Sequence, residues 1–286
     1  MDEPLGCLDL ITPDRGTIPL KVECQAIIPS EHLAKNIAVN LERDVPRFVV
    51  NSGRTILKNE PLAVVSSGHS LNDQFDELGK FKNILTCGSA HDHVVRHGII
   101  PNYAIVSDAG KEDKGNLSLR NHETLYILAS QCDPGLYEHL KDYRVEMWHY
   151  KGQAYPSLEE EAEALNGEPS IAWGSTITMN SFHLAFLLGF QHLHFFGFDN
   201  CYSEYGVDQH ACKISGGISY DKQPIYAGKE KRFFISNLAL AAQCEQFFKL
   251  VEAWHQWIHV TLHGDGLAAE MVRQGDPALQ EFVSLA

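Results

Sequence analysis

The sequence lacks any segment with the features of a membrane span or an export signal. No apolar run reaches the roughly 20 residues that a transmembrane helix needs. The first residues, Met1, Asp2 and Glu3, offer neither the basic start nor the apolar core of a signal peptide. Basic side chains are also few, because 23 Lys and Arg stand against 37 Asp and Glu, for a formal net charge of -14. Such a surface repels polyanions, so we expect a cytoplasmic protein without a nucleic-acid partner.

Several familiar catalytic and metal-binding motifs are missing as well. Cys residues number 7, an odd count, and contain no C-x-x-C pair, which argues against a disulfide framework and against a cysteine-based zinc site. No Walker A sequence, nucleophile elbow or H-E-x-x-H motif occurs. Among the 15 His, His255, His259 and His263 recur every four residues, but 257–262 alternates like a strand, so we expect no metal site there.

From about residue 60 onward, short apolar runs alternate with helical patterns. With 44% hydrophobic residues over 286 positions, the chain can bury a sizeable core. This alternation is typical of an α/β fold with a mostly parallel sheet. We expect strands near 62–66, 82–87, 103–107, 124–129, 144–149, 192–197 and 257–262. Helices are expected near 71–80, 89–97, 134–141, 175–188, 229–253 and 266–273.

Two regions depart from this alternation. Residues 1–58 hold one amphipathic stretch, about 31–43, and we interpret them as a small N-terminal extension packed on the main domain, 59–286. Residues 200–228 have weak periodicity and many Tyr, Gly, Ser and Asp, which indicates an insertion over the sheet edge that could act as a lid. The sequence leaves open whether the protein forms a homo-oligomer.

Small polar residues end the predicted strands, and open α/β sheets bind ligands at the carboxyl ends of their strands. The first strand runs into a turn at 66–71, where Gly68 permits a tight bend and Ser70 with Asp73 predicts a capping box for the next helix. A second hydroxyl-capped helix start follows at 174–176. Two helix N-termini aimed at one crevice would suit a diphosphate or a nucleotide. Ordinary strand-to-helix turns would show the same pattern.

Two carboxylates stand where predicted strands end. Asp108 follows the strand Tyr-Ala-Ile-Val-Ser, and Asp199 follows Leu-His-Phe-Phe-Gly-Phe. Carboxylates held rigidly at strand ends commonly bind Mg²⁺ or a ribose hydroxyl, and burying their charge is costly unless it is paired. Capping of the following loop is the alternative for both.

Histidine and basic residues in and after the insertion complete the candidates. His210 could act as a general base or acid because imidazole titrates near physiological pH, and a solvated loop histidine fits its spacing equally well. Lys229, Lys231 and Arg232 form a basic cluster in an acidic chain and could reach phosphate oxygens. A solvated helix start is the alternative for this cluster.

Four segments in order carry a family resemblance. Residues 63–71 resemble a strand entering a G-x-G-P-S-L turn, with Ser and His where that pattern has its first Gly and its Pro. Residues 98–108 resemble G-I-x-P-D-Y followed by a strand ending in Asp, with Asn in place of the first Asp, and 174–199 resemble G-S-V … A-L-x-L-G-x … G-x-D. Residues 264–266 match a small-residue loop after the final strand. Together they are similar to the MptE-like family, named for 6-hydroxymethylpterin diphosphokinase and related to bacterial motility accessory factors and, more distantly, sialyltransferases.

The resemblance implies a nucleotide-dependent transferase on a Rossmann-like sheet with helices on both faces. The first implied reaction is Mg²⁺-dependent diphosphate transfer from ATP to a 6-hydroxymethylpterin-type acceptor. The second is transfer of a nonulosonic, sialic-like acid from a CMP donor in surface glycan or flagellin glycosylation. A non-catalytic nucleotide-binding protein is the third alternative. The partners would be a nucleotide and a small-molecule acceptor.

The resemblance also suggests roles for the candidate residues. Asp108 and Asp199 would hold Mg²⁺ or a ribose, and His210 would be the base toward an acceptor hydroxyl. Phosphoryl-type transfer needs little beyond such positioning and charge compensation. The residues expected to contact phosphates are Gly68, Ser70, Gly174, Ser175, Thr176, Lys229 and Arg232.

Overall fold

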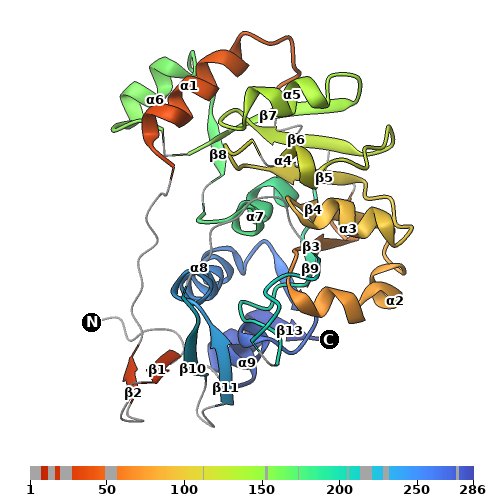
Figure 1. The fold of residues 1–286 in the computed structure, drawn as a ribbon, viewed down its shortest axis with the longest axis vertical. Coiled ribbons are helices and arrows are strands. Elements are labelled where there is room, and N and C mark those ends of the chain that lie inside the picture. Colours follow the sequence, from red (N-terminus) through yellow and green to blue (C-terminus); the bar gives the residue numbers. More distant parts are fainter. Residues whose placement is uncertain are drawn as a thin grey trace.

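A nine-stranded sheet runs through the molecule (Figure 1). The computed structural model describes residues 8–11, 17–19, 28–48, 57–111, 113–151, 154–172, 174–204, 206–212, 221–227, 232–274 and 277–286. The strands of the sheet are β3 (Pro61–Val65), β4 (Asn83–Cys87), β5 (Tyr103–Val106), β6 (Leu125–Ala129), β7 (Arg144–Tyr150), β8 (Ser170–Ala172), β9 (His192–Phe196), β12 (His259–Leu262) and β13 (Val283–Leu285). Their order is β13-β12-β9-β3-β4-β5-β6-β7-β8, and every neighbouring pair is parallel.

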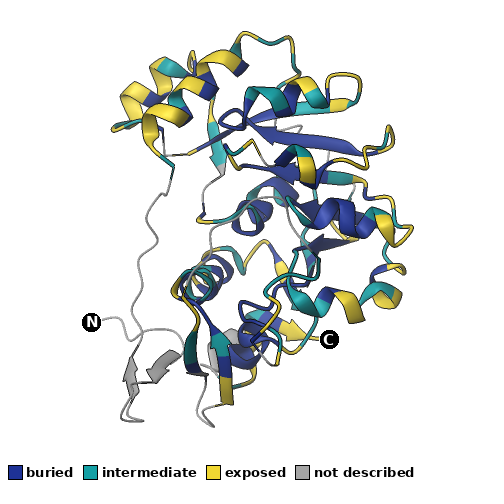
Figure 2. Ribbon diagram, viewed as in Figure 1, coloured by how far each residue is buried: buried dark blue, intermediate teal, exposed yellow. Residues whose placement is uncertain are grey.

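All seven predicted strands are present, as β3, β4, β5, β6, β7, β9 and β12. Their apolar runs are continuous because both faces of the sheet are covered, and every residue of β6 is buried. Figure 2 shows this burial along the sheet. The two strands that the pattern missed, β8 and β13, have three residues each, too few for a recognisable run. The α/β fold is therefore confirmed.

Helices cover both faces of the sheet. They are α1 (Ser30–Leu41), the 3₁₀ helix η2 (His69–Asp73), α2 (Phe75–Leu78), α3 (Ala90–Arg96), α4 (Asp113–Asn116), α5 (Pro134–His139), α6 (Leu158–Ala164), α7 (Ile177–Leu187), α8 (Leu238–Trp254), α9 (Leu267–Gln274) and α10 (Pro277–Phe282). Along β3, Ala63 and Val65 pack with Leu71 and Val94 on the side of η2 and α3. The alternate residues of β3 belong to the other core cluster, which contains Phe182 of α7 and residues of α8.

A second, smaller sheet corrects one helix prediction. The expected helix 229–253 is wrong in its first part, because Arg232–Ser236 form strand β11. This strand pairs antiparallel with β10 (Gln223–Ala227) in a sheet of order β11-β10-β1-β2, with β1 (Leu8–Ile11) and β2 (Thr17–Pro19). The helix α8 begins only after Asn237, whose side-chain oxygen accepts a hydrogen bond from Leu240 N at 2.9 Å.

The described parts of 1–58 lie in two places (Figure 1). β1 and β2 belong to the small sheet near α9, whereas α1 lies beside α5 and α6 at the far end of the molecule. Asn40 of α1 donates hydrogen bonds to Ser130 O and Cys132 O in the loop after β6, at 2.9 and 2.8 Å. The division into an extension and a main domain remains a prediction. None of the described helices has both the length and the apolar character that crossing a bilayer requires.

Candidate functional site

The order of the strands places a crevice beside β3. From β3 the chain moves outward through β4 to β8, and then returns to the other side of β3 as β9. Ligands of open α/β sheets bind at such a reversal, outside the carboxyl ends of the strands. The loops that meet there follow β3 (66–70), β9 (197–199), β4 (88–89) and β12 (263–266), with Asp108 one strand further along after β5.

Asp199 is enclosed on the β9 side of this crevice. Its side chain is 2% exposed, and Oδ2 accepts a hydrogen bond from Ser70 N at 2.9 Å. Glycines let the neighbouring loops close on it, since a Cβ on Gly68 would lie 2.3 Å from Gly197 O and one on Gly266 would lie 2.6 Å from Asp199 Cα. The carboxylate therefore ties the loop after β9 to the loop after β3, and the loop after β12 packs closely against the Asp199 backbone.

The predicted capping box at this turn is absent. Gly68 precedes η2 as the N-cap residue and no side chain caps it. The N–H of Ser70 is taken by Asp199 rather than by Asp73, and Ser70 Oγ accepts from Gln74 Nε2 at 3.2 Å. Gly68 and Ser70 thus form part of a packed turn around Asp199.

On the β4 side, two hydroxyls and an imidazole form a chain of hydrogen bonds. Ser89 Oγ donates to Ser67 Oγ at 3.0 Å, and Ser67 Oγ lies 3.0 Å from His210 Nδ1. The segment that carries His210 is held against β3's loop by a bridge between Gly68 and His210 and by Ala211 N donating to Ser67 O at 2.8 Å. Burial lowers the pKa of His210, while a hydrogen bond to the Ser67 backbone raises it. The imidazole is therefore neutral at neutral pH.

Asp108 is accessible on the same side of the sheet. Its surface is exposed, and yet the surrounding protein raises the pKa of the carboxyl by desolvation. Tyr150, at the end of β7, lies close enough for the Asp108 charge to contribute to raising the pKa of its phenol, after burial.

The two predicted metal ligands do not share a site. Asp108 and Asp199 follow β5 and β9, which stand three strand spacings apart, about 14 Å at the usual separation of neighbouring strands. Within the described ranges, no three His, Cys, Asp or Glu side chains gather closely enough to hold a metal ion. Mg²⁺ is often held by one or two carboxylates together with water and substrate phosphates. Asp108 fits that kind of site, and Asp199 does not fit as its second ligand.

The first turn of α7 borders the crevice. Gly174 has φ +145°, and a Cβ there would lie 2.4 Å from Met179 Cβ, so the entry to the helix requires glycine. Ser175 is engaged elsewhere, because its N and Oγ both donate to Gln246 Oε1 at 2.7 Å. Thr176 is the N-cap residue and makes no side-chain capping bond.

Two buried polar atoms in this turn have no hydrogen-bond partner among the described residues. They are Thr176 Oγ1 and Asn180 Oδ1. Thr178 Oγ1 lies 2.8 Å from Ser66 Oγ after β3, which holds the turn against the sheet, and Asn180 Nδ2 donates to Thr176 O at 2.7 Å within the turn. A buried hydroxyl or carbonyl without a partner costs about 1–3 kcal/mol. A ligand that reached this turn could supply the partners.

The structure describes one of the three predicted basic residues, Arg232. Lys229 and Lys231 are not among the described residues. The Arg232 guanidinium bonds both carboxylate oxygens of Asp265, at 3.0 and 2.8 Å, and Glu270 Oε2 at 3.0 Å. The structure thus places Arg232 in an ion-pair network that joins β11 to the loop after β12.

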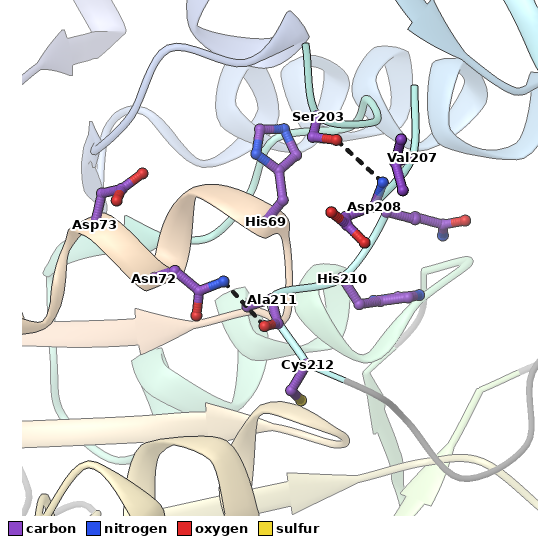
Figure 3. A pocket seen from close by; sticks show the side chains of 10 residues that line it. His69, Asn72, Asp73, Ser203, Val207, Asp208, His210, Ala211 and Cys212 are labelled. Carbon is purple, nitrogen blue, oxygen red and sulfur yellow. Dashed lines mark hydrogen bonds between the residues drawn. The ribbon is translucent and has the colours of Figure 1, made fainter. Parts of the chain in front are cut away.

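A second hollow lies on the outer side of the segment 203–212 (Figure 3). It is an open pocket of about 830 Å³. Asn72 Nδ2 donates to Ala211 O across its floor at 3.0 Å, and the His210 ring extends away from Asn72 and His69 (Figure 3). His210 therefore both lines this pocket and contacts the hydroxyl of Ser67. Its lining is His69, Asn72, Asp73, Ser203, Val207, Asp208, Gln209, His210, Ala211 and Cys212.

Comparison with known proteins identifies the family. The model of the family described as 6-hydroxymethylpterin diphosphokinase MptE-like matches residues 31–205, more than half of the chain. The chain belongs to the MptE-like family. Its match ends before His210, so the hydroxyl chain joins a family segment to a residue beyond it. No curated protein matches the sequence.

Among solved structures, this MptE-like protein is similar to the MAf glycosyltransferase from Magnetospirillum magneticum AMB-1. The two share 16% identity with a TM-score of 0.61, and the likeness covers 85% of this chain. This chain spans 38% of that protein's length. At this identity the likeness concerns the fold, and it supports the Rossmann-like architecture expected from the sequence.

Proposed function

We propose that this protein is a nucleotide-dependent transferase that passes a diphosphate group from ATP to the hydroxyl of a 6-hydroxymethylpterin-type acceptor. Membership of the MptE-like family supports the reaction class. The observation that carries the proposal is the first turn of α7, where Thr176 Oγ1 and Asn180 Oδ1 are buried without partners among the described residues. In the nucleotide complex, the Thr176 hydroxyl donates to a phosphate oxygen and Asn180 Oδ1 accepts from a hydroxyl of the nucleotide.

The chemistry uses the open side of the crevice. The acceptor hydroxyl attacks the β-phosphorus of ATP, the bond from that phosphorus to the α–β bridging oxygen breaks, and AMP leaves. His210, neutral and held beside the β3 loop, takes the proton of the attacking hydroxyl. Asp108 would hold Mg²⁺, and the ion would compensate the charge of the phosphates. Asp199 maintains the loops and does not touch the reacting atoms.

A second candidate is glycosyl transfer from a CMP-activated nonulosonic acid. It is favoured by the fold likeness to a protein named as a glycosyltransferase and by the separation of Asp108 from Asp199, which leaves one accessible carboxylate. Here His210 would take the proton of an acceptor sugar hydroxyl, the glycosidic bond would form at the anomeric carbon, and CMP would leave. This reaction needs no metal.

A thermal-shift panel separates these reactions. ATP, GTP, CMP, a CMP-sugar and NAD are each added with and without Mg²⁺, since a ligand at 100 times its dissociation constant stabilises the fold by about 2.7 kcal/mol. A Mg²⁺-dependent response to ATP supports diphosphate transfer, and AMP release with a hydroxymethylpterin then confirms the reaction. A metal-independent response to CMP compounds favours glycosyl transfer. Nucleotide binding without turnover of either substrate class would contradict both.

A matched pair of variants tests the nucleotide site itself. Thr176→Val removes a buried hydroxyl that has no partner in the described structure, so the free protein should keep its stability while the nucleotide-induced shift falls. Thr178→Val, two residues along, removes a hydroxyl that already pairs with Ser66. It should lower the stability of the free protein and keep the nucleotide response. The reverse pattern would show that the first turn of α7 is not part of the nucleotide site.

A further inference from the structure

Ala211 attaches the segment 203–212 to the loop after β3 and to η2. Its N–H donates to Ser67 O at 2.8 Å, and its carbonyl accepts from Asn72 Nδ2 at 3.0 Å (Figure 3). Its methyl group packs against the core cluster on the side of η2 and α3. The main-chain donor, the main-chain acceptor and the side chain of Ala211 are therefore all engaged, directly beside His210.

Asn72 uses both ends of its amide. Because a carbonyl oxygen can only accept, the bond to Ala211 O requires the NH₂ group of Asn72 on that side, and Oδ1 then faces the other way. There Oδ1 lies 2.8 Å from His93 Nε2. An amide oxygen is likewise only an acceptor, so His93 Nε2 carries a hydrogen and donates it. His93 thus orients the amide, and the amide holds Ala211.

His93 can orient the amide because its own ring is fixed by packing. The ring is buried and packs edge-on against Phe75 and His97, at 5.3 and 4.6 Å between ring centroids. His93 lies on α3, which follows β4, whereas Asn72 lies on η2, which follows β3. Two neighbouring strand–helix units therefore hold Ala211, which comes 139 residues after Asn72 in the chain.

The anchor acts beside the imidazole of His210 and does not contact it. A main-chain bridge joins Gly68 to His210, and His210 Nδ1 lies 3.0 Å from Ser67 Oγ. Among the described residues, the Asn72 side chain bonds the neighbouring Ala211 and makes no hydrogen bond to His210. Any effect of Asn72 on the imidazole therefore passes through the backbone of Ala211.

We propose that Asn72, oriented by His93, is a positioning residue that anchors Ala211 and thereby holds His210 against the loop after β3. The role of His210 in transfer rests on the proposed function, whereas the anchor itself does not. Asparagine supplies what is needed because one amide offers both a donor to Ala211 O and an acceptor to His93 Nε2–H. A carboxylate of the same shape lacks the donor.

Amide hydrogen exchange in the full chain tests the anchor without reference to activity. Asn72→Ala should speed exchange of the Ala211 N–H about fivefold, the factor expected for one net hydrogen bond. Asn72→Asp keeps the acceptor for His93 but loses the donor, and should do the same. Asn83→Ala is the matched control, because Asn83 Nδ2 also donates to a carbonyl, Pro61 O at 3.3 Å, at the amino ends of β3 and β4. Wild-type exchange at Ala211 in either Asn72 variant would overturn the proposal.

An NMR titration shows whether the anchor acts on His210, whose signals are assigned by their loss in His210→Gln. Burial lowers the pKa of His210 in the intact protein, so a looser segment in Asn72→Ala should raise it toward the ordinary value of about 6.5. Asn72→Ala introduces no charge, so such a rise reports on the surroundings of the ring. An unchanged titration of His210 together with faster Ala211 exchange would overturn the positioning role.

Kinetics supply the last arm. If His210 is the base, Asn72→Ala should lower kcat about fivefold with KM for the nucleotide nearly constant, and move the acidic limb of the pH profile up with the measured pKa. A rise in KM with unchanged kcat would place Asn72 in nucleotide binding and overturn the proposal. Unchanged kcat and KM despite altered exchange and titration would sustain the anchor and remove His210 from the mechanism. The same alterations in a protein that transfers neither group would sustain the anchor and refute the proposed function.

Discussion

On the two sides of β3, an aspartate at the end of a parallel strand has opposite surroundings. On the β9 side, Asp199 is 2% exposed, receives an N–H from Ser70 and is surrounded by glycine loops. On the β4 side, Asp108 also ends a parallel strand, but its surface is exposed. An acidic residue at a strand end is thus a buried tie between loops in one place and an exposed carboxylate in the other.

Packing by glycine accounts for the difference. The loops after β3 and β12 pack closely here, since a Cβ added to Gly68 or Gly266 would lie within 3 Å of atoms of Gly197 or Asp199. The opposite side presents hydroxyls instead, with Ser67 and Ser89 beside His210. One side of the crevice is therefore closed by backbone packing, whereas the other presents hydroxyls and an exposed carboxylate.

The largest expected effect is a loss of stability when a side chain is added to the tightly packed β9 side of the crevice. Gly266→Ala would place a Cβ 2.6 Å from Asp199 Cα and O, and should lower the free energy of unfolding by about 3 kcal/mol. Urea denaturation measures it. Gly79→Ala is the control, since its Cβ would approach Phe75 O only to 3.3 Å. Equal stability of the two variants would show that the β9 side is not tightly packed.

Next comes a pair of carboxylate substitutions. Asp108→Asn should reduce transfer about 100-fold, because it removes the charge that holds the ion and phosphates, and leave the urea midpoint unchanged. Asp199→Asn should do the reverse, lowering stability by about 2 kcal/mol through the weakened bond to Ser70 N while the nucleotide response persists. Full turnover in Asp108→Asn would remove Asp108 from the mechanism and erase the contrast.

Lowering the pH should reduce the free energy of unfolding through His263, which lies in the loop after β12 on the β9 side of the crevice. Burial and the neighbouring His194, whose Nδ1 lies 3.0 Å from His263 Nε2, lower the pKa of His263 to about 4. The unfolded chain, with a histidine pKa near 6.5, then binds more protons as pH falls, so this stability is present above about pH 6.5 and is lost toward pH 4. With allowance for partial exposure, we expect about 1 kcal/mol between pH 7 and pH 5.

Urea midpoints at the two pH values check this prediction. His263→Gln should reduce the pH dependence, part of which remains because burial also lowers the pKa of His183 to about 4, whereas His32→Gln, at an exposed position of α1, should leave it unchanged. If both variants keep the wild-type slope, other groups carry the pH dependence.

The smallest effect is expected at Arg232. Arg232→Met breaks the pair with Asp265, but Glu270 keeps Arg273 at 3.0 Å, so the stability loss should be about 0.5 kcal/mol. The nucleotide-induced thermal shift should be unchanged. A clear loss of that shift would show that Arg232 contacts the phosphates of the nucleotide and that the ligand reaches the β9 side of the crevice.

The strands could be predicted from sequence because local information defines them. Both faces of the parallel sheet are covered, so its strands are continuous apolar runs, and those of β3 to β7 are recognisable without knowledge of their partners. β11 was mistaken for a helix because its partner is β10, and that strand in turn pairs with β1. The strand character of 232–236 depends on those neighbours.

The site was less predictable for the same reason. The predicted capping box at Ser70 is absent because Asp199, 129 residues away in the sequence, accepts the hydrogen bond from Ser70 N. Ser67 and Ser89 were not singled out because only the adjacency of β3 and β4 and the return of 203–212 bring them to His210. A serine two residues after each of two successive strands was the available signal, and it became meaningful once the strand order was known.

The small antiparallel sheet also limits how early the fold can be completed during synthesis of the chain. Leu8 of β1 pairs with Ala227 of β10, so the first strand of the chain has its partner more than 200 residues later. During synthesis, β3 to β8 can associate with one another, and β1 can pair with β2, well before β10 emerges. The joining of the β1–β2 pair to β10 is therefore a late step, and a chain stopped before β10 would leave that pair without the rest of its sheet.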